Sequence, residues 1–129
     1  MMRNVNGFGV ADSDESATVR ATPVVTSERL RDAVVLTVAG EIDMTTAPAL
    51  EDAVRKSLIE RPATLVIDLS GAEFFSSAGI AVLMLAHRND SGVALRVVAT
   101  DRIVLRPLEL TGLTGDLAIY DSVDTALEA

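Results

Sequence analysis

The stretch LVIDLSGAEFFSSAGIAVLML, from Leu65 to Leu85, contains the pattern from which the fold can be inferred. Apolar and β-branched residues at its start predict a buried strand over residues 63–69. The polar run over residues 70–73 predicts a turn, and the apolar run that follows predicts a buried helix over residues 78–87. Ser76 and Ser77 precede this helix, so their hydroxyls are expected beside backbone N–H groups that lack a partner within the helix.

The flanking sequence extends this alternation of strand and helix in both directions. Apolar runs closed by turn residues predict strands, and apolar residues three or four apart predict helices. We expect strands over residues 24–30, 33–39, 93–99 and 117–120, and helices from Thr45 or Thr46 to about residue 60, over residues 102–110 and over residues 123–128. Pro107 predicts a kink or a late start in the helix that contains it.

The order of these elements predicts the fold class and the domain limits. Strands that alternate with helices indicate an α/β layered domain, in which helices pack on a mixed and mostly parallel sheet. We expect residues 21–129 to form this single domain. Residues 1–20 mix Asn, Gly, Asp, Ser and Glu with little periodicity, so we expect them to form a flexible tail.

Composition and charge exclude several classes of function. The chain has 129 residues, of which 49% are hydrophobic and 3% aromatic, and its formal net charge is -8 without a basic cluster. Nucleic acids and anionic membranes need clustered cations, so binding to either is not expected. Cysteine is absent and His87 is the single histidine, which argues against disulfides, thiolate chemistry and a Cys/His metal site. No signal peptide or membrane-spanning segment is evident, and we expect a cytoplasmic protein.

Four carboxylates near the predicted strand ends, Glu41, Asp43, Asp68 and Glu73, are the residues most suited to catalysis. Paired carboxylates can perform acid–base chemistry or bind Mg²⁺. Acidic residues are also common at solvated loop ends and helix starts, which is the favoured interpretation here. The sequence contains neither a P-loop nor a G-x-S-x-G elbow around the serine pair. We therefore expect no enzymatic activity, no cofactor and no metal.

Short motifs that close strands and open helices occur in a characteristic order. They are GEID at residues 40–43, DLSG at 68–71, FSSAG at 75–79, LTGL at 110–113 and DTAL at 124–127. Together they resemble the STAS family, and within it the stand-alone bacterial anti-sigma factor antagonists. The resemblance covers about residues 24–127. It implies a mixed, mostly parallel sheet of about five strands with about four helices mainly on one face.

The resemblance also implies a function. Such antagonists bind an anti-sigma factor that is also a Ser/Thr kinase, and this capture releases a sigma factor. The kinase then phosphorylates a serine at a helix start, which ends the binding, and a metal-dependent Ser/Thr phosphatase reverses the modification. No cofactor, nucleic acid or membrane is part of this cycle.

Carried over residue by residue, the phosphorylated serine corresponds to Ser77, with Ser76 as the second choice. The implied partner-binding residues are Asp43, Glu73, Ser76, Ser77, Ala78 and Gly79. Gly79 is expected to leave room for a partner backbone, because it has no side chain. Ser76 departs from the family pattern, which usually has aspartate before the acceptor serine. This departure removes a charge from the expected contact.

Three alternatives remain open on the sequence. The serine pair can be a plain helix cap, since serine is common at that position. A small STAS domain can also be a regulatory subunit of a lipid-transport ABC complex. A small enzyme that uses the loop carboxylates is the third and least favoured alternative.

Overall fold

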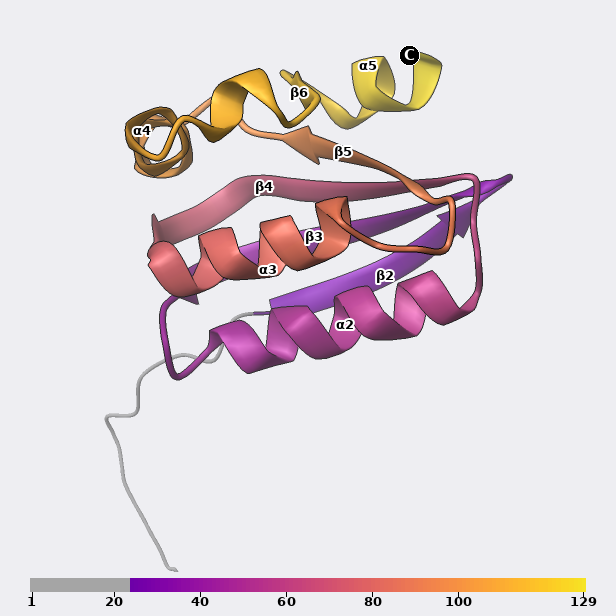
Figure 1. Ribbon diagram of the computed structural model, residues 1–129, viewed down its shortest axis with the longest axis horizontal. Coiled ribbons are helices and arrows are strands. Elements are labelled where there is room, and N and C mark those ends of the chain that lie inside the picture. Colours follow the sequence, from indigo (N-terminus) through magenta and orange to yellow (C-terminus); the bar gives the residue numbers. More distant parts are fainter. Residues whose placement is uncertain (1–23) are drawn as a thin grey trace, which may run out of the picture.

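One mixed sheet organises the chain, and its strands follow one another across the sheet in sequence order (Figure 1). The computed structural model describes residues 24–129. The order β2-β3-β4-β5-β6 contains one antiparallel pair, β2 with β3, and three parallel pairs. The strands span Val24–Leu30 (β2), Ala33–Ile42 (β3), Thr64–Phe75 (β4), Ala94–Val98 (β5) and Ile119–Tyr120 (β6). The predicted α/β class, with a mixed and mostly parallel sheet, is confirmed.

The helices follow the predicted order. They span Ala47–Ile59 (α2), Ser77–His87 (α3), Arg102–Leu110 (α4) and Val123–Glu128 (α5), with a short 3-10 helix, η1, over Leu113–Gly115. Of the kink or late start predicted for α4, the late start is wrong, because the side chain of Asp101 accepts a hydrogen bond from the Ile103 amide and caps the helix before Pro107. Pro107 lies inside α4. No helix within residues 24–129 is long and apolar enough to cross a membrane.

The predicted turn over residues 70–73 is wrong, because β4 continues through these residues to Phe75. β3 likewise continues past its predicted end at residue 39 and pairs with this extension as far as Ile42 and Phe75. The pairing register shifts twice on the way, and Gly40 adopts a φ of 101° there. Such bulges allow a polar, glycine-containing run to stay paired within a sheet. The same composition is common in turns, which is why the sequence predicted a turn here.

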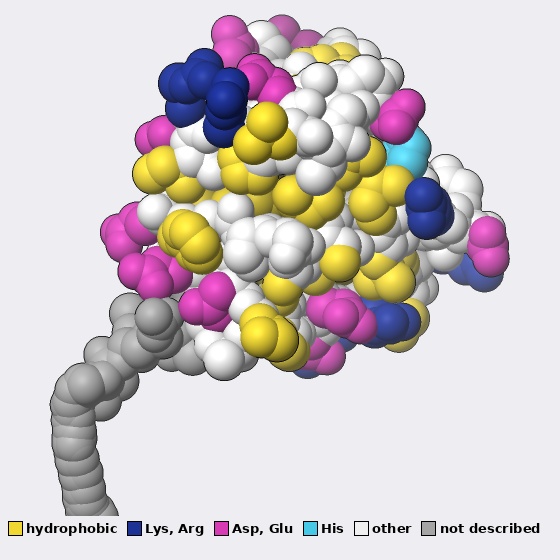
Figure 2. All heavy atoms as spheres, turned by 60° about the vertical axis from the view of Figure 1, so that its left-hand side comes forward, with side chains coloured by type: hydrophobic (Ala, Val, Ile, Leu, Met, Phe, Trp, Pro, Cys, Tyr) yellow, Lys and Arg dark blue, Asp and Glu magenta, His cyan; other side chains and the backbone are white. Residues whose placement is uncertain are grey.

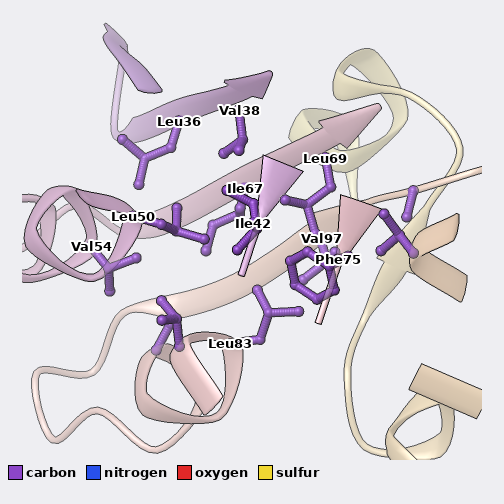
Figure 3. Packing of buried hydrophobic residues seen from close by; sticks show 14 of the residues in the cluster. Leu36, Val38, Ile42, Leu50, Val54, Ile67, Leu69, Phe75, Leu83 and Val97 are labelled. Atoms are coloured by element: carbon purple, nitrogen blue, oxygen red, sulfur yellow. The ribbon is translucent and has the colours of Figure 1, made fainter. Parts of the chain in front are cut away.

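The two faces of the sheet are covered unequally. Alternate residues of β3, such as Leu36 and Val38, point into a large apolar cluster to which α2, α3 and α4 contribute (Figure 3). The opposite face carries a small cluster of Val35, Val66 and Val98, which α5 covers through Ala126. Most of the helical burial therefore lies on one face, as predicted. The expected tail over residues 1–20 lies outside the described residues.

Candidate functional site

Two strand-to-helix junctions lie side by side at the carboxyl edge of the sheet. Ile42, the last residue of β3, is the pairing partner of Phe75, the last residue of β4. The amide of Ser76 donates to the carbonyl oxygen of Ile42 over 2.9 Å, which fixes the second junction on the first. Because the strands are parallel, α2 and α3 begin at this same edge. Asp43 and the serine pair, far apart in sequence, are thereby brought to neighbouring loops.

The loop between β3 and α2 is organised by the Asp43 carboxylate. Its Oδ1 accepts hydrogen bonds from the amide and hydroxyl of Thr45 at 2.9 and 2.8 Å and from the amide of Thr46 at 3.1 Å. Thr46 occupies the N-cap position of α2, but its hydroxyl makes no capping bond to the helix. That buried hydroxyl instead accepts from the Asp43 amide at 2.8 Å and donates to the Glu41 carbonyl at 2.7 Å.

These hydrogen bonds determine the electrostatics of Asp43. The hydroxyl bond from Thr45 is the main cause that lowers the pKa of the Asp43 carboxyl below its ordinary value of 3.8. Partial desolvation opposes this effect, and the remaining bonds from Thr45 and Thr46 support it. Asp43 is therefore a firmly ionised group that also holds its own loop in shape.

The cap of α3 is provided by Ser76. Its backbone is extended, and its Oγ accepts a hydrogen bond from the Ala78 amide at 3.2 Å. The Ser76 carbonyl accepts the first helical bonds, from the amides of Gly79 and Ile80. The capping role considered for the serine pair therefore belongs to Ser76.

Ser77 occupies the first helical position and is exposed. Within residues 24–129, its hydroxyl has no hydrogen-bond partner, whereas the Ser76 hydroxyl is engaged in the cap. Ala78 follows it and is partly exposed. The junction thus separates two tasks, because one serine holds the helix start and the next presents a hydroxyl to solvent.

Gly79 is buried and serves the interior of the domain. A Cβ added at this position would lie 2.6 Å from Cε1 of Phe75 and 2.9 Å from Cγ2 of Ile42. The absence of a side chain therefore lets α3 approach the ends of β3 and β4 closely. This role differs from the expected one, in which Gly79 leaves room for a partner.

Two exposed apolar side chains on this edge were missed in the sequence. Met44, in the loop before α2, is 81% exposed, and Phe74, beside the buried Phe75, is 50% exposed. Figure 2 shows hydrophobic side chains across the middle of the face where β4 ends and α3 begins, with acidic side chains at several places around its margin. Glu73 is also exposed on β4. A methionine between Asp43 and Thr45, outside any apolar periodicity, was the available signal for Met44.

The other candidate carboxylates lie within strands, Glu41 in β3 and Asp68 and Glu73 in β4. Asp68 uses Oδ1 to accept from the amide and hydroxyl of Ser70, at 3.0 and 2.7 Å. Within the described part of the chain, no group of three or more His, Asp or Glu side chains is arranged to hold a metal ion. Asp43 holds the loop before α2, as favoured from the sequence. Asp68 instead lies inside β4, so the strand-end position predicted for it is wrong.

Fold and site together define a class: a small α/β domain that presents a free serine hydroxyl at a helix start, among apolar and acidic side chains. The family model described as STAS domain matches residues 24–126. The chain belongs to the STAS family.

Within this family, the chain is similar to several proteins named as anti-sigma factor antagonists. The chain is 37% identical over 94 residues to the anti-sigma-F factor antagonist RsfB of Mycobacterium tuberculosis, with 72% of this chain and 77% of the relative covered. It is 32% identical over 103 residues to the anti-sigma-F factor antagonist RsfA of the same organism, with 75% and 79% covered. An anti-sigma factor antagonist from Mycobacterium paratuberculosis has a solved structure with a TM-score of 0.74 and 34% identity, covering 85% of this chain and 97% of that one. The predicted resemblance to such antagonists is confirmed.

Proposed function

We propose that this STAS domain is an anti-sigma factor antagonist, switched off by phosphorylation of Ser77. The observation that carries the switch is the division of labour at the start of α3, where Ser76 caps the helix and Ser77 stays exposed without an internal hydrogen-bond partner. The names of RsfB and RsfA support the antagonist role. The binding surface is centred on Ser76, Ser77 and Ala78, with the neighbouring carboxylates of Asp43 and Glu73 on its rim.

The partner in this proposal is an anti-sigma factor with Ser/Thr kinase activity. Its ATP donates the γ-phosphoryl group: the bond from phosphorus to ADP breaks, a bond to the Ser77 Oγ forms, and the hydroxyl proton passes to a base on the kinase. A metal-dependent phosphatase restores the serine by hydrolysis, which releases inorganic phosphate. The chain itself supplies only the acceptor hydroxyl and the docking surface.

Phosphorylation is expected to spare the fold. A phosphate adds about -1.5 to -2 of charge at pH 7. At the first position of α3 this charge meets the positive end of the helix dipole, and the Ser76 cap does not involve the modified hydroxyl. The first turn of α3 contains no acidic residue that would repel it.

The same phosphate is expected to break the contact with the partner. It adds negative charge beside Asp43, which is ionised at neutral pH, and near the exposed Glu73. The partner's surface is complementary to these carboxylates and to a neutral serine, so the phosphate would lie in the interface without a cation to pair with. A mispaired charge at an interface costs about 2–5 kcal/mol, or about 30-fold or more in affinity.

Ser76 remains the second choice as acceptor. Its Oγ accepts a hydrogen bond from the Ala78 amide, so phosphorylation of Ser76 would replace a neutral helix cap by a charged one. As the family usually has aspartate at this position, the chain presents its partner with one negative charge fewer, which we expect to weaken recognition by a kinase adapted to that aspartate.

The experiment that tests the function is partner capture from a lysate of the source organism. Full-length wild type, Ser77→Asp and Ser77→Ala are immobilised, and retained proteins are identified by mass spectrometry. We expect wild type and Ser77→Ala to retain an anti-sigma factor and Ser77→Asp to lose it. The matched control is Ser27→Asp, which adds the same charge at an exposed position on β2.

The outcomes separate the alternatives. Equal retention by Ser77→Asp and wild type would overturn the switch. Retention of the ATPase subunits of a lipid transporter, without an anti-sigma factor, would replace the antagonist role by that of a transport subunit. Incubation of the captured anti-sigma factor with ATP and wild type should yield a phosphopeptide containing Ser77, and modification confined to Ser76 would move the acceptor by one residue.

A further inference from the structure

Met44 places a thioether at the surface, in the loop between β3 and α2. Among the described residues it is the most exposed of the large hydrophobic side chains, at 81%. Met84, on α3, is only partly exposed and packs against the main apolar cluster. The chain has no cysteine and four methionines, of which Met1 and Met2 lie outside the described residues. Within residues 24–129, Met44 is therefore the sulfur-containing side chain that a dissolved oxidant reaches most easily.

The residues on either side of Met44 hold the loop in shape. Oδ1 of Asp43 accepts hydrogen bonds from the amides of Thr45 and Thr46. The Thr46 hydroxyl donates to the carbonyl oxygen of Glu41 at 2.7 Å. Met44 itself belongs to neither apolar cluster of the described domain. A chemical change at its sulfur should therefore leave the fold intact.

Met44 lies beside the surface that presents Ser77. Ile42 pairs with Phe75, so the two loops that follow these strands emerge next to each other. Met44 and Ala78 line the same surface hollow, and Ala78 directly follows Ser77. An exposed apolar side chain at the margin of a recognition surface is covered when a partner binds there. A change in the polarity of Met44 therefore alters the surface that the proposed partner contacts.

We propose that Met44 is a site of reversible oxidation, and that its sulfoxide weakens binding of the anti-sigma factor independently of Ser77. This inference rests on the proposed function. The oxidant is a peroxide: a lone pair of the Met44 Sδ forms a bond to one peroxide oxygen, and the O–O bond breaks. The proton on the transferred oxygen passes to the leaving oxygen, which departs as water or an alcohol.

The electrons of this step balance, and the step can be reversed. The sulfur loses two electrons, and the peroxide gains them. Methionine sulfoxide reductases restore the thioether. In that reaction two thiols of the reductant are oxidised to a disulfide, and the sulfoxide oxygen leaves as water.

The sulfoxide of Met44 and a phosphate on Ser77 act through different physical effects. A sulfoxide is polar and neutral, so it loses hydration when an apolar partner surface covers it. A phosphate acts through its charge, which added salt screens. We therefore expect the effect of the sulfoxide on affinity to be independent of salt, and the effect of the phosphate to shrink as salt is added.

The test begins with oxidation of the full-length protein by dilute hydrogen peroxide, which is removed before binding is measured. Peptide mass spectrometry follows sulfoxide formation at Met44 and Met84, and we expect Met44 to react severalfold faster. The oxidised protein is then titrated by isothermal calorimetry with the anti-sigma factor retained in the capture experiment. Affinity should fall about fivefold at both low and high salt, and should return after treatment with methionine sulfoxide reductases A and B.

Matched variants assign the effect to one sulfur atom. Met44→Leu keeps an apolar side chain of similar size and should bind like wild type before and after peroxide treatment. Met84 remains in this variant, which therefore controls for oxidation elsewhere in the chain. Met44→Gln has a polar, neutral side chain and should bind about fivefold more weakly without any oxidant. Thermal melts establish that oxidised wild type and both variants are folded.

Wild-type affinity after complete oxidation of Met44 would overturn the inference and leave the proposed function standing. A loss of affinity that also occurs in oxidised Met44→Leu would assign the effect to another methionine, which overturns the inference as well. Oxidation of Met44 no faster than that of Met84 would contradict its assignment as the reactive site. Failure of wild type to bind any anti-sigma factor would overturn the proposed function and this inference together.

Discussion

The junctions β3–α2 and β4–α3 lie side by side and begin their helices in different ways. In the first, the Asp43 carboxylate accepts hydrogen bonds from the amides of Thr45 and Thr46 and from the Thr45 hydroxyl. In the second, Ser76 caps the helix with a neutral hydroxyl and leaves the next hydroxyl, that of Ser77, exposed. The side chain of the first junction is engaged in hydrogen bonds within its loop, whereas the second junction leaves the Ser77 hydroxyl exposed.

The comparison shows how the proposed modification site can lie at a helix start without taking part in the cap. An N-cap side chain that accepts from one of the first amides of a helix stabilises the helix by about 1 kcal/mol. Because Ser76 supplies this acceptor, the Ser77 hydroxyl is not needed to cap the helix. The buried Gly79 allows the start of α3 to pack closely on Phe75. Packing on the sheet and the Ser76 cap therefore both fix the helix start.

The largest expected effect comes from disturbing the packing under the second junction. Gly79→Ala should lower the free energy of unfolding by up to about 2 kcal/mol, because overpacking against Phe75 costs about 1–3 kcal/mol and alanine regains about 1 kcal/mol in helix propensity. Chemical denaturation measures this change. Gly115→Ala is the control, since an added Cβ there meets nothing within 4 Å. Recovery of stability in Gly79→Ala/Phe75→Leu would locate the cost at this contact, and equal stability of both glycine variants would refute it.

The next effect distinguishes the two serines. Ser76→Ala should cost about 1 kcal/mol of stability through the lost cap, whereas Ser77→Ala and Ser77→Asp should stay within about 0.5 kcal/mol of wild type. Urea titrations at neutral pH compare the three variants. A larger loss for Ser77→Ala than for Ser76→Ala would mean that the capping assignment is reversed.

A related comparison restores the family's usual residue. Ser76→Asp should keep the stability of wild type, because aspartate and serine cap helices about equally well. It should also increase the rate of Ser77 phosphorylation by the captured anti-sigma factor, if that kinase recognises the aspartate usual in the family. Phosphorylation is followed by intact mass spectrometry, and a rate equal to that of wild type would show that this charge plays no part in recognition.

The smallest effect concerns the pH response of the first junction. The pKa of Asp43 is lower in the folded chain than its ordinary value of 3.8, so its stabilisation is complete above that value and is lost as the pH falls through the lower folded pKa. The difference in melting temperature between wild type and Asp43→Asn should therefore be constant above about pH 5 and shrink at lower pH. A difference that stays constant down to pH 2 would contradict the role of the ionised carboxylate.

Local patterns predicted much of this molecule because they depend on neighbours in the chain. The order of strands and helices and the cap of α3 within the pair Ser76–Ser77 follow from apolar spacing and turn residues. The polar run over residues 70–73 misled this reasoning. Its place in a strand depends on pairing with β3, including the bulge at Gly40, and such pairing joins segments distant in sequence.

The sequence by itself determined the class of fold, the family and the position of the serine pair, because apolar periodicity and motif order are properties of the linear chain. Only the tertiary structure decided which serine caps and which is exposed, that Gly79 is needed for internal packing, and that Met44 is exposed beside the start of α3. Each of these depends on distances between side chains that are brought together only when the strands pair and the helices pack on them.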